Sequence, residues 1–204
     1  FPYGSVKEIY IDGVPCWAFR ISYVGENGWE IYSRMEHGLK LWDAVWAAGQ
    51  EFDIIPVGIG VYAVTGRIEK GYRFAGVDMH TDYTADESGL GFAVHLGKSG
   101  FIGKQAVVAE RAQGSKKRLV PILLDDPNAA ALGGEPILIN GTKAGYVTSA
   151  NFGYSVGKSI AYGYLPAEQA SPGTRVSVRI FDREVEGVVS TEPIFDPTGS
   201  RLRV

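Results

Sequence analysis

Cysteine is almost absent from this chain of 204 residues, in which Cys16 is the only thiol. A single cysteine excludes an internal disulfide framework and a multi-cysteine zinc site. Cys16 lies in strand-like sequence, which favours a buried structural thiol over a nucleophile. The three histidines, His37, His80 and His95, are scattered and lack zinc-ligand spacing. We therefore predict no metal site.

Strong charge of one sign and long apolar runs are also missing. The 20 basic and 23 acidic residues give a formal charge of −3, which argues against an electrostatic nucleic-acid binder. No apolar run approaches the ~20 residues that cross a bilayer, so we expect no membrane partner and a cytoplasmic location. The 45% of hydrophobic residues are enough to bury a core in one or two domains.

Common catalytic motifs are absent too: the sequence contains neither a Gly-x-Ser-x-Gly elbow nor a phosphate loop. Residues 58–63 do imitate a dinucleotide fingerprint, with Asp78 and Asp82 downstream. That fingerprint requires a second buried strand ending at the acidic residue, whereas residues 69–87 are polar and loop-like. We therefore reject a nucleotide site.

The first half of the chain mixes strand and helix patterns. Residues 5–11 and 14–24 predict a hairpin around the turn Asp12-Gly13. Residues 35–48 predict an amphipathic helix, with Ser33 and Glu36 as a capping box and Gly49 as the C-terminal cap. The helix should pack its apolar side chains into the core, namely Met35, Leu39, Trp42 and Trp46. A short strand over 54–57 and helices over 60–69 and 104–112 complete this half.

The second half is almost entirely strand-like. A polar segment at 114–118 indicates a domain linker. Six short strands follow, at 119–124, 136–140, 143–149, 159–165, 175–181 and 184–190, and Asn140-Gly141 is a hairpin turn. Such spacing predicts a small antiparallel β-barrel. The fold class is therefore α+β, with one domain over residues 1–114 and a β-barrel domain over 115–204.

Residues 23–30 are the strongest candidate for a binding site. A strand rich in aromatic and β-branched residues runs into a glycine-punctuated turn that presents Tyr23, Glu26 and Glu30. Gly25 and Gly28 would let a ligand approach closely. A carboxylate there could accept two parallel N–H bonds from a flat heterocycle. The alternative is a strand corner whose glutamates point to water.

This segment resembles the signature Arg-x-x-Tyr-x-Gly-Glu-x-Gly-x-Glu of the glycine cleavage T-protein family, the tetrahydrofolate-dependent aminomethyltransferases. The matching residues are Arg20, Tyr23, Gly25, Glu26, Gly28 and Glu30. Further matches follow in order at 67–73, 76–79, 88–94, 101–104, 146–149, 158–161, 172–173 and 193–197. The resemblance thus covers nearly the whole chain.

The resemblance implies an incomplete folate-binding aminomethyltransferase-like domain followed by the barrel. Tyr23 and Glu30 would contact folate, with Glu30 on the amino-pyrimidine edge of the pterin. Glu26 is more doubtful as a ligand, and Arg67 should be a structural ion-pair partner. Family members carry a folate-binding arginine where this chain has Ala63. The family's acid–base aspartate precedes the matched region, so catalytic residues stay unknown and we expect this C-terminal part alone to be inactive.

The one-carbon donor is open at this point. An aminomethyl–lipoyl carrier protein is one possibility, and a fused or partner flavin dehydrogenase is another. Residues 69–73 resemble the folate domains of dimethylglycine and sarcosine dehydrogenases more closely than free-standing T-proteins. A folate-dependent O- or S-demethylase and a non-catalytic folate-binding module are the remaining alternatives. The module is disfavoured because Tyr72 and Arg73 follow Lys70-Gly71 where its motif has a cysteine.

Overall fold

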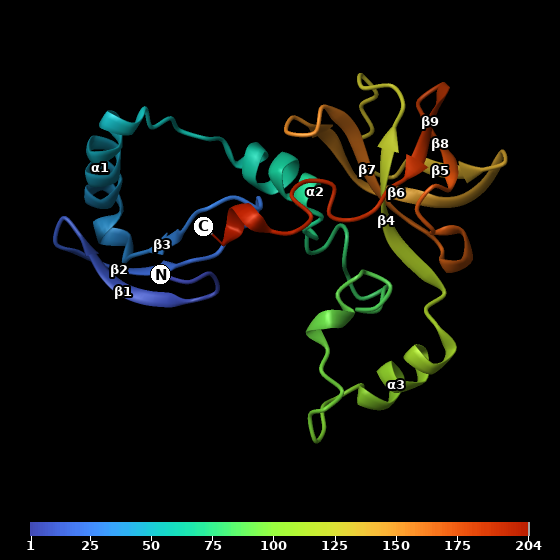
Figure 1. The fold of residues 1–204 in the computed structure, drawn as a ribbon, viewed down its shortest axis with the longest axis horizontal. Coiled ribbons are helices and arrows are strands. Elements are labelled where there is room, and N and C mark those ends of the chain that lie inside the picture. Colours follow the sequence, from blue (N-terminus) through green and yellow to red (C-terminus); the bar gives the residue numbers. More distant parts are fainter. Residues whose placement is uncertain (204) are drawn as a thin grey trace.

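The computed structural model describes residues 1–203, with a small sheet and its helix on one side and a β-barrel on the other (Figure 1). The sheet contains β1 (Val6–Ile11), β2 (Val14–Phe19) and β3 (Glu30–Tyr32), antiparallel and in that order. The turn Asp12-Gly13 joins β1 to β2 with φ values of 46° and 73°, which confirms the predicted hairpin. The predicted extension of β2 to residue 24 is wrong. The Ser22 hydroxyl instead accepts the backbone N–H groups of Val24 and Glu26 and closes a turn.

The first helix forms as predicted but is not buried as predicted. A 3₁₀ turn (Met35–His37) leads into α1 (Gly38–Gly49), and a second 3₁₀ turn (Gln50–Phe52) follows. The predicted capping box is wrong, because the Ser33 hydroxyl donates to the Arg34 carbonyl and no side chain caps the helix. The predicted cap at Gly49 is also wrong, since Gly49 is the last helical residue and Gln50 is the C-cap. Trp42 and Trp46 are 58% and 36% exposed and stack on each other, so their assignment to the core is also wrong. Residues 54–57 form no strand.

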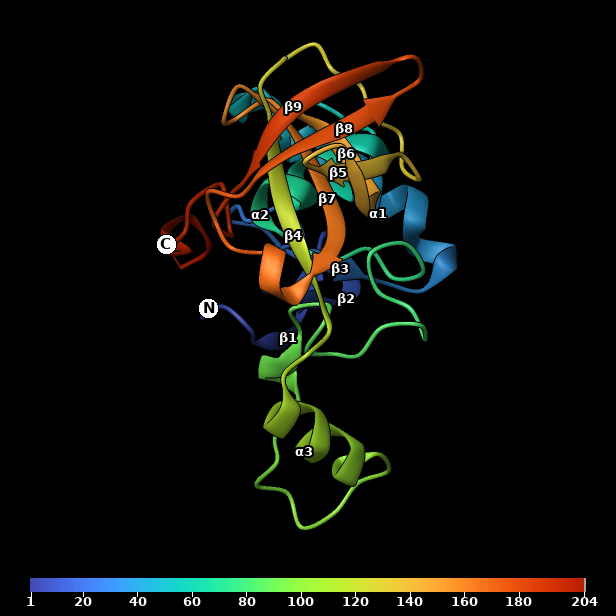
Figure 2. The same ribbon diagram turned by 90° about the vertical axis from the view of Figure 1, so that its right-hand side faces the viewer.

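The centre of the molecule is a continuous helical segment. A π-helix, η3 (Val61–Gly66), passes directly into α2 (Arg67–Lys70), which ends at Gly71 with φ of 75°. The predicted helix over 60–69 is therefore confirmed. A short 3₁₀ turn (Gly91–Ala93) precedes α3 (Lys104–Gln113), which Gly114 terminates as predicted. Helix α3 projects away from the rest of the molecule (Figure 2).

The second half is a closed six-stranded antiparallel barrel, so the predicted fold class is confirmed. Its strands are β4 (Lys117–Leu124), β5 (Pro136–Ile139), β6 (Thr142–Gly153), β7 (Lys158–Pro166), β8 (Arg175–Ile180) and β9 (Arg183–Val189). They close in the order β4-β7-β6-β5-β8-β9. Side chains such as Ile122, Ile137 and Val178 are fully buried and fill the interior. The domain boundary at residues 114/115 stays a prediction.

Two sets of contacts join the halves. Ile68 of α2 packs on a second apolar cluster with Leu119, Ile160, Tyr162 and Tyr164 of the barrel. A 3₁₀ turn (Ala167–Gln169) follows β7, and another (Ser200–Leu202) lies near the end of the chain. The segment after β9 returns to the first half, where the Phe195 N–H donates to the Glu69 carbonyl over 3.0 Å (Figure 1). These contacts hold α2, the barrel and the C-terminal segment together.

Candidate functional site

Tyr23 lies half-buried in the loop between β2 and β3. Its hydroxyl donates to the backbone carbonyl of Arg73 over 2.6 Å. Its ring stacks on Tyr72, with 5.9 Å between centroids and 12° between planes. Burial raises the pKa of the Tyr23 hydroxyl, so this group stays protonated at neutral pH. The hydroxyl is thus committed to the backbone, which leaves the ring as the group that could face a ligand.

Glu30 is the first residue of β3, and its carboxylate is held from two sides. The Tyr62 hydroxyl donates to Oε1 over 2.6 Å, and the Tyr32 hydroxyl donates to Oε2 over 2.7 Å. A carboxylate offers about four acceptor positions, so each oxygen keeps one for a further donor. The carboxylate is therefore oriented and still able to accept two parallel N–H bonds.

Tyr62 connects the two predicted site residues. Its ring centroid lies 5.6 Å from that of Tyr23, while its hydroxyl reaches Glu30. Burial, followed by the hydrogen bond to Glu30, raises the pKa of Tyr62 to about 12. Tyr62 therefore remains a donor at any physiological pH. The structure brings Tyr23 and Glu30 together through this third side chain.

Sequence reasoning did not identify Tyr62 or Tyr32 as members of the site. Tyr32 stands two residues after Glu30 in a strand, and this spacing places both side chains on the same face. That spacing was a usable signal. Tyr62 is separated from Glu30 by 32 residues and reaches it from η3, so no local pattern could have revealed it.

Gly25 and Glu26 of the loop have structural roles. Gly25 has φ of 78°, and a Cβ there would lie 2.6 Å from the Lys70 side chain, so packing requires the glycine. Gly28 faces open space. Glu26 pairs with Arg201 over 3.0 Å, which ties the loop to the C-terminal segment. Glu26 is therefore a structural residue, as the sequence suggested.

Arg67 forms the buried ion pair predicted for it. Arg67 is 4% exposed and its partner Asp78 is 1% exposed. The Asp78 carboxylate also accepts the hydroxyls of Thr148 and Ser149 from β6. The Arg67 Nε donates to the Ala63 carbonyl over 2.9 Å, so position 63 contributes only its backbone here. This network joins α2 to the barrel.

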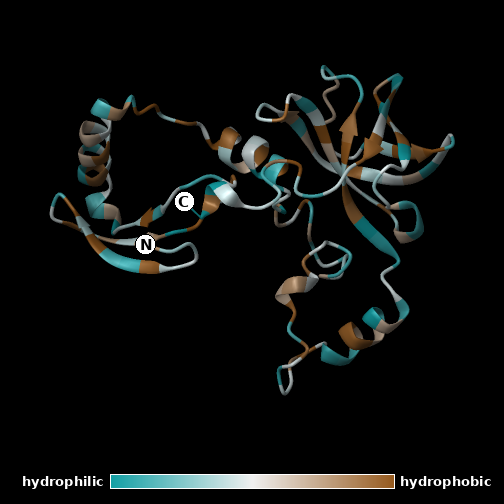
Figure 3. Ribbon diagram, in the orientation of Figure 1, coloured by the Kyte–Doolittle hydropathy of each residue, from teal (hydrophilic) through white to brown (hydrophobic). Residues whose placement is uncertain are grey.

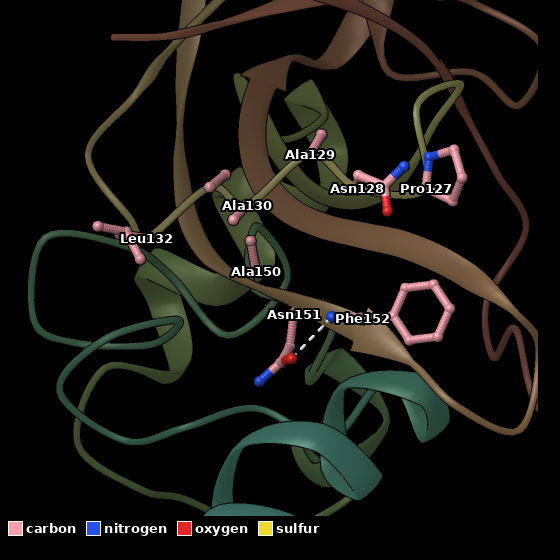
Figure 4. A pocket seen from close by; sticks show the side chains of 9 residues that line it. Pro127, Asn128, Ala129, Ala130, Leu132, Ala150, Asn151 and Phe152 are labelled. Atoms are coloured by element: carbon pink, nitrogen blue, oxygen red, sulfur yellow. Dashed lines mark hydrogen bonds between the residues drawn. The ribbon is translucent and has the colours of Figure 1, made fainter.

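Neither Tyr23 nor Glu30 lines either of the two pockets described next. A pocket of about 420 Å³ lies between β6 and residues 127–132 and has no ionisable lining side chain (Figure 4). A second pocket, of about 340 Å³, includes Tyr32 and Arg34 beside β2.

Within residues 1–203, no group of three or more His, Cys, Asp or Glu side chains could hold a metal ion. No helix in this range is long and apolar enough to span a membrane.

Comparison with known families and proteins agrees along the whole chain. The GCVT N-terminal domain matches residues 1–98, and the glycine cleavage T-protein C-terminal barrel domain matches residues 117–196. The chain is 38% identical over its full length to human mitochondrial dimethylglycine dehydrogenase, of which it covers 24%. It is also 33% identical, over 89% of its length, to the aminomethyltransferase of Caldanaerobacter subterraneus subsp. tengcongensis, of which it covers 48%.

A solved structure shares the fold. The glycine cleavage system aminomethyltransferase T from Bartonella henselae superimposes with a TM-score of 0.86 over 97% of this chain, at 23% identity. The match covers 54% of that protein. The chain thus spans between about a quarter and about half of the proteins it matches. The two domain matches, the relatives and the shared fold lead to one conclusion: the chain belongs to the glycine cleavage T-protein family.

Proposed function

We propose that this chain forms the pterin-holding part of a tetrahydrofolate-dependent aminomethyl- or one-carbon transferase. The observation that carries the proposal is the Glu30 carboxylate, which two tyrosine hydroxyls orient without using all of its acceptor positions. An ionised carboxylate of this kind matches the two adjacent N–H donors of an amino-pyrimidine ring, because parallel charge-assisted bonds fix both position and direction. The aminomethyltransferase names of several relatives support the same chemistry.

Each side chain of the site has a defined part in this proposal. Tetrahydrofolate would supply the amine nitrogen N5 that accepts the one-carbon unit. Glu30 would orient the pterin, and the Tyr23 ring would cover it while its hydroxyl stays on the Arg73 carbonyl. The barrel would close one side of the site. These residues bind and orient, and no described side chain is assigned the proton transfer.

The donor in this proposal is an oxidised amine made by a fused or partner flavin dehydrogenase. The match to dimethylglycine dehydrogenase, at 38% identity over the whole of this chain and 24% of that protein, favours it over a lipoyl carrier protein. The sequence Glu-Lys-Gly-Tyr-Arg at residues 69–73 points the same way. Its backbone also builds the site, since the Arg73 carbonyl holds Tyr23.

Product analysis tests the proposal on the full-length protein. Incubation with dimethylglycine and tetrahydrofolate should yield 5,10-methylenetetrahydrofolate, and Glu30→Gln should reduce the yield without reducing amine oxidation. Formation of 5-methyltetrahydrofolate from an O- or S-methyl donor would instead show a demethylase. Folate binding with no folate product from either donor class would show a non-catalytic binding module.

A further inference from the structure

We propose that Tyr62 is a positioning residue that sets the direction of the Glu30 carboxylate for its ligand. The inference rests on the proposed function and adds a residue that the sequence motif does not contain. Its first support is geometric. Tyr62 and Tyr32 approach different oxygens of one carboxylate, over 2.6 Å and 2.7 Å, and they come from different elements. Two donors on two oxygens fix the rotation of the carboxylate plane, which one donor would leave free.

The two tyrosines are not equivalent. Tyr32 belongs to the same strand as Glu30 and is 53% exposed, so water competes for its hydrogen bond. Tyr62 is half-buried and reaches Glu30 from η3. A hydrogen bond shielded from water is the stronger electrostatic restraint. Tyr62 is therefore the dominant restraint on the carboxylate.

The helical segment that carries Tyr62 is itself held against the site loop. Gly66, at the end of η3, packs so closely on Val24 that a Cβ would lie 2.6 Å from its side chain. Arg67, directly after η3, is locked by its buried pair with Asp78. The Tyr62 hydroxyl is thus fixed relative to the β2–β3 loop before any ligand arrives. Such preorganisation lowers the entropy lost on binding.

The hydroxyl and the ring of Tyr62 can be separated experimentally. The ring contacts Tyr23, whereas only the hydroxyl contacts Glu30. Tyr62→Phe therefore retains the ring contact and removes the hydroxyl, which holds Glu30 and also contacts the Tyr23 backbone. Tyr10→Phe is the matched control, because Tyr10 is 76% exposed in β1 and the hydroxyls that hold Glu30 are those of Tyr32 and Tyr62.

The test is a double-mutant cycle on the full-length protein. Dissociation constants for 5-formyltetrahydrofolate are measured by calorimetry for the wild type, Tyr62→Phe, Glu30→Gln and the double variant, with Tyr10→Phe alongside. Thermal unfolding of each variant shows that the fold is retained. Tyr62→Phe should weaken binding about tenfold, the size of one lost hydrogen bond to a charged group. In the Glu30→Gln background the same substitution should weaken binding much less, because the neutral amide oxygen accepts a weaker hydrogen bond than the carboxylate and coupled residues are non-additive.

Three results would overturn the inference, and they differ in whether they also contradict the proposed function. Equal losses from Tyr62→Phe in both backgrounds would show that Tyr62 acts independently of Glu30. Wild-type affinity in Tyr62→Phe, together with weakened binding in Glu30→Gln, would remove the role of Tyr62 and leave the proposed function intact. Absence of binding by the wild type itself would contradict the proposed function and this inference with it.

Discussion

Tyr23 contacts two other tyrosines: its ring is tilted against that of Tyr62 and stacked on that of Tyr72. The pKa values of Tyr62 and Tyr72 are raised to about 12, in both cases chiefly by burial. Unfolded tyrosines titrate near pH ~10. A tyrosine whose pKa is higher in the folded than in the unfolded state stabilises the folded state. This stabilisation is complete below pH ~10 and is lost as the pH rises towards 12.

The tyrosinate absorbance should therefore rise in more than one step. As the pH is raised, the more exposed of the eleven tyrosines should ionise first. The remaining tyrosines should ionise at higher pH, where the folded state loses stability. Tyr62→Phe should remove part of the late fraction. A single transition near pH ~10 for all tyrosines would contradict the burial of this cluster.

Asp78 is the residue on which the junction between the halves depends. Its buried carboxylate neutralises Arg67 and accepts hydrogen bonds from the Phe74 N–H, Thr148 and Ser149. Asp78→Asn would leave the Arg67 charge buried without a counter-ion, so the free energy of unfolding should fall by about 3–5 kcal/mol. Chemical denaturation measures the loss.

The control for this prediction is Asp125→Asn. Asp125 pairs with Arg175 at the surface, where both side chains are more than half exposed. Solvent screening makes such pairs weak, so this variant should lose far less stability. If both variants lost a similar free energy of unfolding, the Arg67–Asp78 pair would not be what holds the two halves together.

The site could be predicted from the sequence only in part, and Glu30 and Tyr62 show why. Glu30 belongs to a local motif whose residue order alone indicates a binding role. Tyr62 enters the site because η3 crosses the β2–β3 loop, and that arrangement depends on packing between distant segments. Arg67 was recognisable as an ion-pair residue, while its contacts with β6 required the barrel to be placed.

Secondary-structure elements followed the sequence where the signals are local. All six barrel strands and the turns Asp12-Gly13 and Asn140-Gly141 formed as predicted, because alternation and turn residues act over a few positions. The wrong predictions concern ends and burial. β2 ends at Phe19 because Ser22 competes for backbone donors, and the apolar side chains of α1 lack a covering element among the described residues.

Strand β7 supplies a prediction at this scale. A Cβ at Gly163 would lie 2.6 Å from the Tyr146 carbonyl oxygen of β6, which is too close for any side chain. Gly163→Ala should therefore lower the free energy of unfolding by about 1–3 kcal/mol, as overpacking does. Gly97→Ala is the control, because a Cβ there meets no atom within 4 Å. Thermal unfolding that is equal in both variants would contradict the close β6–β7 contact.

Hydrophobic residues recur along α1 and the segment after it (Figure 3), and several of the large ones are exposed to solvent. Leu39, Phe52, Ile55 and Ile59 are each at least 73% exposed. Soluble chains rarely leave such a group uncovered. This 204-residue chain should therefore bind an apolar fluorescent dye, and Leu39→Lys should reduce dye fluorescence without lowering the unfolding temperature.

The unfolding temperature of Leu39→Lys also tests whether Leu39 is exposed. A large drop in the unfolding temperature would mean that Leu39 lies in the core, as the helical periodicity predicted. The sequence pattern alone could not decide this point, because an apolar face indicates that something covers it and not which segment does. Only the three-dimensional arrangement shows that the described residues leave the face open.

The central claim is that Glu30 holds the pterin, and calorimetric titration with 5-formyltetrahydrofolate tests it most directly. The full-length protein should bind saturably, and Glu30→Ala should weaken binding by about 1–3 kcal/mol because it strands the ring donors. Glu36→Ala, an exposed acidic residue just before α1, should bind like the wild type. Equal affinity in the Glu30→Ala variant, or no binding by the wild type, would contradict the account.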